Sequence, residues 1–135
     1  MKDELFRDPT TRLNRFEFNK NVAEVFDDML TRSVPFYWEI QNMICDFAHK
    51  FVKEKGLIYD LGCSTGTTIK LLVETLNKKD LTFIGIDKSV DMLNKAKQKL
   101  IPYKEKIDFI AEDLNNNIEI KECDLVIVNL CLQFL

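Results

Sequence analysis

The chain has 135 residues, 46% hydrophobic and 30% charged, which is the balance of a globular domain with a single core. Its net charge of -3 gives no general attraction to nucleic acid or anionic membranes, so direct binding to either is not expected. The N-terminal MKDELFRDPT lacks the apolar core of a signal peptide, and no apolar run is long enough to span a membrane. The four cysteines form neither a zinc pattern nor a disulfide framework, which predicts reduced thiols, no metal and a cytoplasmic location.

Two amphipathic helices are predicted before the first strand. The segment 21–31 places its hydrophobic residues on one helical face. A second helix is predicted from Pro35 to about Val52, because proline suits the first turn of a helix and the residue before it is pushed out of the helical region. Gly56, after a basic segment, is a typical helix end. Residues 1–55 are therefore expected to form an N-terminal helical extension.

From Gly56 onwards, short apolar strands alternate with helices. Helices are predicted from Gly66 to Asn77 and after Ser89, which is a suitable N-cap. Strands are predicted in LIYDLG (57–62), LTFIGID (81–87), KIDFIAED (106–113) and CDLVIVNL (123–130). This alternation is typical of a parallel sheet with helices on both faces, and right-handed crossovers then require a doubly wound order. The fold class is therefore α/β and Rossmann-like, with residues 56–135 as the ligand-binding domain.

Two further features shape this prediction. The last strand ends at Asn129 with no covering helix after it, and an apolar strand with an open edge is an aggregation hazard. We therefore expect either a longer protein, with this domain incomplete at its C-terminus, or an edge paired with another subunit. The Lys-rich segment 95–106 is interpreted as mostly the solvated face of a helix.

The loop DLGCSTG (60–66) follows the first predicted strand. Its spacing, D-x-G-x-x-x-G, departs from the G-x-G-x-x-G of dinucleotide-binding turns, which makes an NAD enzyme the least favoured interpretation. Gly62 would let a ligand approach the backbone, and Gly66 would open the helix. Asp60 would repel phosphate but suit an ammonium group. An ordinary strand–helix turn explains the loop equally well.

The other strand ends also carry polar residues, at the edge of the sheet where ligands bind in open parallel folds. Asp87 lies 25 residues after Gly62 and could accept hydrogen bonds from both ribose hydroxyls, or could simply cap a helix. Asp113 and Leu114 could contact adenine, or form a turn. Asn129 could serve the site or a turn. Together these features fit an adenosine with a cationic amino-acid tail, and resemble class I S-adenosylmethionine-dependent methyltransferases.

A closer resemblance extends over most of the chain. The segment FNKNVAEVFDDMLTRSVPFY (18–37), followed by YDLGCS, IGID and the final NLCLQFL, resembles the bacterial carboxy-S-adenosylmethionine synthase family. The resemblance implies a transferase that converts S-adenosylmethionine and prephenate to carboxy-S-adenosylmethionine and phenylpyruvate. It also implies a homodimer, whose product serves a partner enzyme that modifies the wobble uridine of tRNA.

The resemblance also implies a set of cofactor-binding residues, although it assigns no catalytic residue. Lys88 stands where the family usually has Asn, so a backbone contact would survive there while a side-chain contact would not. Two alternatives stay open: a methyltransferase that uses the same cofactor site, and a non-catalytic fragment that binds S-adenosylmethionine. The implied cofactor contacts are Tyr37, Gly62, Cys63, Ser64, Asp87, Lys88, Asp113, Leu114 and Asn129.

Overall fold

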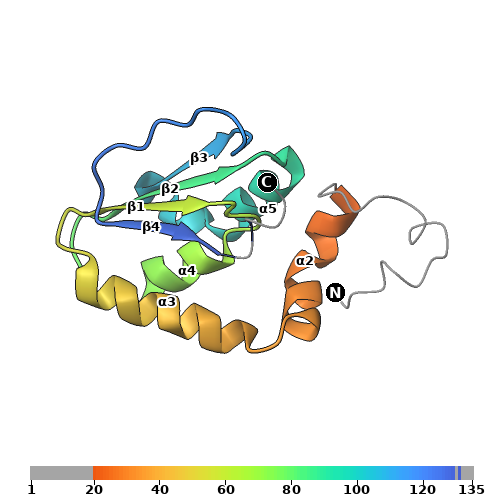
Figure 1. The fold of residues 1–135 in the computed structure, drawn as a ribbon, viewed down its shortest axis with the longest axis horizontal. Helices are drawn as coiled ribbons and strands as arrows, with labels where there is room; N and C mark the ends of the chain where they lie inside the picture. Colours follow the sequence, from red (N-terminus) through yellow and green to blue (C-terminus); the bar gives the residue numbers. More distant parts are fainter. Residues whose placement is uncertain (1–19, 130, 132–135) are drawn as a thin grey trace.

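The computed structural model describes residues 20–129 and residue 131 (Figure 1). The elements are α2 (Lys20–Ser33), α3 (Tyr37–Phe51), β1 (Leu57–Leu61), α4 (Thr67–Thr75), β2 (Thr82–Asp87), α5 (Val90–Lys99), the 3-10 helix η2 (Ile101–Lys106), β3 (Ile107–Ala111) and β4 (Leu125–Val128). Each predicted helix and strand is confirmed, with bounds that differ by a few residues. Residues 1–19, 130 and 132–135, which include the ends of the two terminal motifs, lie outside the described residues.

The four strands form one parallel sheet in the order β3-β2-β1-β4. Ile58 of β1 lies between Phe83 of β2 and Leu125 of β4, which fixes the register at the centre of the sheet. The chain moves outward from β1 through β2 to β3 and then returns to the opposite side of β1. This reversal confirms the predicted doubly wound order and makes the carboxyl end of β1 the switch point of the sheet.

The main core lies on one face of the sheet, between the strands and helices α3, α4 and α5. Since β1, β2 and β3 follow one another in the same direction, right-handed crossovers place α4 and α5 on this same face. The strands contribute Ile58, Phe83, Ile107 and Ile127, and the helices contribute residues that include Ala48, Ile69, Leu72 and Leu93. All of these side chains are at most 7% exposed, so this face is a dry core.

The opposite face of the sheet lacks helices among the described residues, so the expectation of cover on both faces is wrong for this part of the chain. The β3–β4 connection, residues 112–124, returns without forming a helix (Figure 1). It contacts this face through the backbone N–H of Lys121, which donates to the Tyr59 hydroxyl at 3.2 Å. Ile110, Val126 and Val128 stay 40–41% exposed. The predictions of β3 and β4 are confirmed, but residues 112–124 between them form no helix that could cover this face.

Helix α2 lies beyond the carboxyl ends of the strands (Figure 1). Phe26 of α2 packs with Met92 of α5 in a small second hydrophobic cluster, joined by the partly buried Met29 and Leu30. Isolated helices of this length are marginal in water, so α2 depends on such tertiary contacts. The first helix of the chain is thereby placed next to the edge of the sheet where the candidate site residues gather.

Candidate cofactor site at the carboxyl ends of the strands

The loop between β1 and α4 is a tight turn built on left-handed backbone. Gly62, Ser64 and Gly66 have φ angles of 76°, 52° and 79°. The N–H groups of Gly62 and Cys63 both donate to the Ile86 carbonyl, at 2.7 and 3.0 Å. Gly66 is the N-cap residue of α4, as its place in the sequence predicted. The loop therefore needs glycine at its two ends, because only glycine adopts these angles without strain.

The glycines also make room for neighbouring parts of the chain. A Cβ atom added at Gly62 would lie 2.7 Å from Cβ of Cys131, and one added at Gly85 would lie 2.9 Å from Sγ of Cys63. The Cys131 thiol donates to the Leu61 carbonyl at 3.4 Å. Close approach to Gly62 was predicted for a ligand, and the structure places the chain's own Cys131 there. Cys63 is 5% exposed and serves as a small packing residue.

Asp87, at the end of β2, is bonded to the same loop. Its Oδ2 accepts from the Ser64 N–H at 3.0 Å, and its Oδ1 accepts from the Ser89 N–H at 2.9 Å. Burial raises the pKa of Asp87, against the lowering effect of these two hydrogen bonds and of the Lys88 charge. The cap of α5 is Ser89, whose hydroxyl accepts from the Met92 N–H at 3.3 Å. Each carboxylate oxygen of Asp87 keeps a further lone pair for a ligand hydroxyl.

Asp60 adds a second carboxyl group beneath the loop. It is 4% exposed, and burial, followed by the charge of Asp87, raises its pKa to about 7. A cation placed near the two acids would favour the ionised form of Asp60, which burial and the Asp87 charge disfavour. The loop therefore offers a negative environment rather than the positive one that phosphate requires. This agrees with the exclusion of a dinucleotide turn.

The residues expected at the ends of β3 and β4 lie at the same edge of the sheet. Asp113 accepts from the backbone N–H of Asn115 at 2.9 Å and from its Nδ2 at 3.0 Å, which is the turn that the sequence left open. Leu114 reaches within 3.9 Å of the position that a Gly62 Cβ would take. Asn129 directly follows β4 and is half-buried. Lys88 is exposed, and its charge lowers the pKa of both Asp87 and Asp113.

Tyr37 is the first residue of α3 and is 5% exposed. Burial and then the charge of Asp27 raise its pKa, while hydrogen bonds with Thr67 and Gln41 lower it. Thr67 begins α4, so Tyr37 stands beside the end of the glycine loop. The structure therefore brings all nine sequence-predicted residues to the carboxyl edge of the sheet or the adjoining helix ends. Whether each one binds a ligand stays a prediction.

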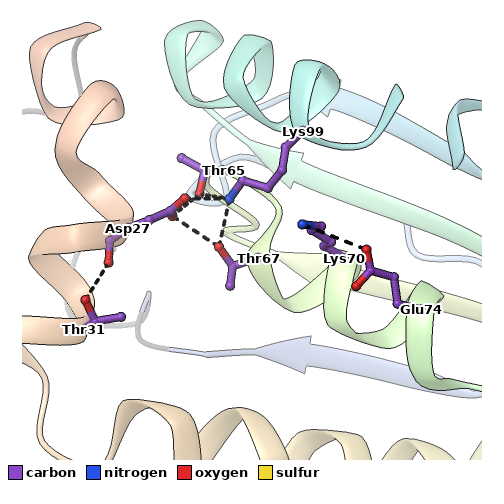
Figure 2. A network of polar contacts seen from close by, with 7 residues as sticks. All are labelled: Asp27, Thr31, Thr65, Thr67, Lys70, Glu74 and Lys99. Carbon is purple, nitrogen blue, oxygen red and sulfur yellow. Dashed lines mark hydrogen bonds and ion pairs between the residues drawn. The ribbon is translucent and has the colours of Figure 1, made fainter. Parts of the chain in front are cut away.

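A polar cluster beside the loop was missed by the sequence analysis. Asp27 of α2 and Lys99 of α5 form an ion pair of 2.7 Å that also includes Thr65 and Thr67 (Figure 2). Burial would raise the pKa of Asp27, but hydrogen bonds with Lys99 and Thr65 and the Lys99 charge lower it. Lys99 is 19% exposed, so the solvated-face interpretation is wrong for this lysine. Nothing local in the sequence distinguishes it from Lys95 or Lys97.

Within residues 20–129 and 131, there is no group of three or more His, Cys, Asp or Glu side chains that could hold a metal ion. No helix in that part of the chain is long and apolar enough to cross a membrane.

Similarity to known proteins agrees with the fold. Residues 58–135 match the methyltransferase domain family, and the chain belongs to this family. Within it, the chain is 41% identical to the carboxy-S-adenosyl-L-methionine synthase of Methylococcus capsulatus, over 98% of this chain and 56% of that protein. It is also 41% identical to the enzyme of the same name from Desulfotalea psychrophila, over 99% of this chain and 55% of that protein. The predicted resemblance is thus confirmed, and the chain spans about half the length of these relatives.

Solved structures share the fold at much lower identity. A candidate S-adenosyl-L-methionine-dependent methyltransferase from Methanococcus maripaludis superposes with a TM-score of 0.63 at 21% identity, over 84% of this chain and 51% of its own. The plantazolicin methyltransferase BamL, solved with S-adenosylhomocysteine, gives 0.61 at 21% identity over 97% of this chain and 44% of its own. These matches establish a partial class I methyltransferase fold.

Proposed function

We propose that this chain binds S-adenosylmethionine at the carboxyl ends of β1 and β2 and carries the cofactor-binding part of a carboxy-S-adenosylmethionine synthase. The single observation that carries the proposal is the glycine loop with its two acids, Asp60 beneath it and Asp87 bonded to Ser64 within it. The acids suit a ligand with an ammonium group at one end and a diol at the other. The names of the two carboxy-S-adenosyl-L-methionine synthase relatives support the more specific activity in the proposal.

In this proposal, different residues contact different parts of the ligand. Asp87 accepts hydrogen bonds from the ribose hydroxyls through the lone pairs that Ser64 and Ser89 leave free. Asp60 and the loop backbone hold the amino-acid end, and Asp113 with Leu114 borders the adenine. Lys88 contributes its backbone and its charge near both acids. When bound, S-adenosylmethionine supplies a carbon activated by the neighbouring sulfonium, to which a carboxyl group can be attached.

The wider assignment follows from the same similarity. The proposed second substrate is prephenate, which loses its carboxyl group as carbon dioxide and its ring hydroxyl as hydroxide while its ring becomes aromatic. The hydroxide takes up the proton that the methyl carbon of S-adenosylmethionine loses as it bonds to the carbon dioxide, and leaves as water. The proposed product, carboxy-S-adenosylmethionine, is then passed to a tRNA-modifying partner enzyme by a cytoplasmic homodimer. A closed, dry pocket would be needed to retain the carbon dioxide. The methyltransferase domain match supports a second candidate, a methyltransferase that uses the same cofactor site.

Binding of S-adenosylhomocysteine, followed by isothermal titration calorimetry, tests the cofactor part of the proposal. Asp87→Asn should weaken binding by about ten- to hundredfold, since hydrogen bonds to a charged group contribute about 1.5–3 kcal/mol. Asp108→Asn is the matched control, because Asp108 is an exposed acid near the amino end of β3, away from the carboxyl ends of the strands. An equal loss in both variants, or no binding by the wild-type chain, would contradict the assignment.

Mass spectrometry of the nucleoside released on denaturation separates the two candidate functions. Carboxy-S-adenosylmethionine would support the synthase and would show that this chain holds its product. S-adenosylmethionine or S-adenosylhomocysteine alone would favour the methyltransferase. Because the chain spans about half of its relatives, turnover should be measured separately from binding.

A further inference from the structure

The Asp27–Lys99 cluster joins three segments that are distant in the sequence, at Asp27, at Thr65 with Thr67, and at Lys99. The Lys99 ammonium donates to Asp27 at 2.7 Å, and to the hydroxyls of Thr65 and Thr67 at 3.1 Å each. Both hydroxyls donate in turn to Oδ1 of Asp27, at 2.5 and 3.2 Å. A lysine ammonium has three donors, and all three are used here. The cluster is therefore fully bonded on its cationic side (Figure 2).

The two threonines place this cluster on the glycine loop. Thr65 is 1% exposed and lies within the loop, while Thr67 begins α4, so the pair flanks Gly66. Gly66 also packs against α5, since an added Cβ would lie 2.9 Å from Leu100 and 3.1 Å from Ala96. The second half of the loop thus packs between the last turn of α5 and the Asp27 side chain of α2. The first half is bonded to β2.

The ion pair has a different setting from ordinary surface pairs of this chain. Lys70 and Glu74 lie one helical turn apart on α4, 3.9 Å from each other, and are 44% and 42% exposed. Their pairing joins one helix to itself. Asp27 and Lys99 lie 72 residues apart, and their pairing joins α2 to α5 and to the loop. Asp27 is still 45% exposed, in a groove between α2, α3 and α4, so its main effect should be geometric rather than on overall stability.

We propose that Asp27 and Lys99 are positioning residues, whose ion pair docks α2 against the glycine loop and holds residues 64–67 in the conformation that receives the ligand. The expected effect on cofactor binding rests on the proposed function, whereas the expected effect on the conformation of the loop does not. Helix α2 then lies across the end of the sheet, and its docking is coupled to the ordering of the loop.

Hydrogen exchange of the full chain without ligand tests this coupling. Asp27→Asn keeps the shape of the side chain and removes its charge, and Lys99→Met keeps the stem and removes the ammonium. Both should speed exchange in α2 and in residues 64–67 by about tenfold, the factor set by losing one charge-assisted bond, with β2 and the β2-bonded residues 62–63 unchanged. Glu74→Gln, the matched control in the same groove, should change neither region.

Three outcomes would overturn the proposal. Exchange could rise in α2 alone, which would leave the loop independent of the pair. Exchange could rise by the same factor in every region of the chain, in Asp27→Asn, Lys99→Met and the milder Lys99→Arg alike, which would make the pair a general stability element. It could also be unaffected in all of them.

A second arm measures S-adenosylhomocysteine binding across the double-mutant cycle. Each single variant should bind about tenfold more weakly, and the double variant about as weakly as either single one, because the two side chains act as one unit. Additive losses would mean that the residues act separately. If the wild-type chain fails to bind, the proposed function fails while the exchange arm still decides the coupling.

Discussion

The two connections that border the candidate site are held in different ways. The β1–α4 loop (62–66) is bonded to β2 through Ile86 and Asp87, and to α2 and α5 through Thr65. The β3–β4 connection (112–124) is mostly exposed, and Asp113 within it bonds to its near neighbours Asn115 and Asn116. The loop proposed to hold the ribose and the amino-acid end is therefore preorganised by long-range bonds, whereas the turn at Asp113, which is proposed to border the adenine, is bonded to its near neighbours.

The largest expected effect is from substitution within the rigid loop. Gly62→Ala forces a side chain into left-handed backbone, at about 1–2 kcal/mol, and against Cys131, where overpacking costs about 1–3 kcal/mol. Chemical denaturation should show the sum as a lower free energy of unfolding. Adding Cys131→Gly to Gly62→Ala should recover the part due to overpacking. If the double variant is no more stable than Gly62→Ala alone, backbone strain is the dominant cost.

The buried acid beneath this loop should give the next largest effect, through pH. The pKa of Asp60 is raised from 3.8 to about 7 in the folded chain, so the folded state holds a proton that the unfolded state has lost. Stability contributed by this group is therefore lost as pH rises from about 4 to 7. Asp60→Asn should flatten the stability profile in that window. A wild-type profile that already rises with pH there would contradict the assignment.

Ligand binding should show the opposite trend from stability over the same pH range. An ammonium-bearing ligand prefers ionised Asp60, so the affinity for S-adenosylhomocysteine should increase as pH rises through about 7. Calorimetry at pH 6 and pH 8 can measure the difference, which Asp60→Asn should remove. Asp108→Asn, the exposed acid on β3, should keep the wild-type dependence.

The contrast between the two connections also marks what the sequence could predict. Gly62, Gly66 and the Ser89 cap were predictable because local backbone geometry demands particular residue types there. The alternation of strands and helices was predictable from hydrophobic periodicity. The Asp27–Lys99 pair was not, because its residues are 72 positions apart and each looks like an ordinary solvated charge.

Two further differences from the predictions have the same origin. The lack of a covering helix on one sheet face, within the part of the chain that the structure describes, depends on the path of residues 112–124. The occupant of the space beside Gly62 is Cys131, a residue that the sequence places close to β4 but not against the β1 loop. In both cases the sequence does not indicate which segments meet after folding. A segment without hydrophobic periodicity gives no sign of the surface that it will contact.

The smallest expected effect on stability lies in the β3–β4 connection, where the effect on dynamics should be clearest. Without ligand, amides 113–117 should exchange faster than amides 62–66, because the bonds of this turn are local and it is mostly exposed. S-adenosylhomocysteine should slow exchange around Asp113 and Leu114 more than in the loop, since only the less ordered region has order to gain.

Asp113→Ala sharpens this last test. The Asp113 carboxylate accepts hydrogen bonds from Asn115, two residues along the chain, so the melting temperature should hardly change, while the ligand-induced slowing around residue 114 should be lost. Asp87→Asn should instead weaken binding without removing the slowing at saturating ligand, because its contacts belong to the rigid loop. Equal protection of both connections in the ligand-free chain would show that the adenine side is as preorganised as the ribose side. The difference in hydrogen bonding between the two connections would then have no counterpart in their dynamics.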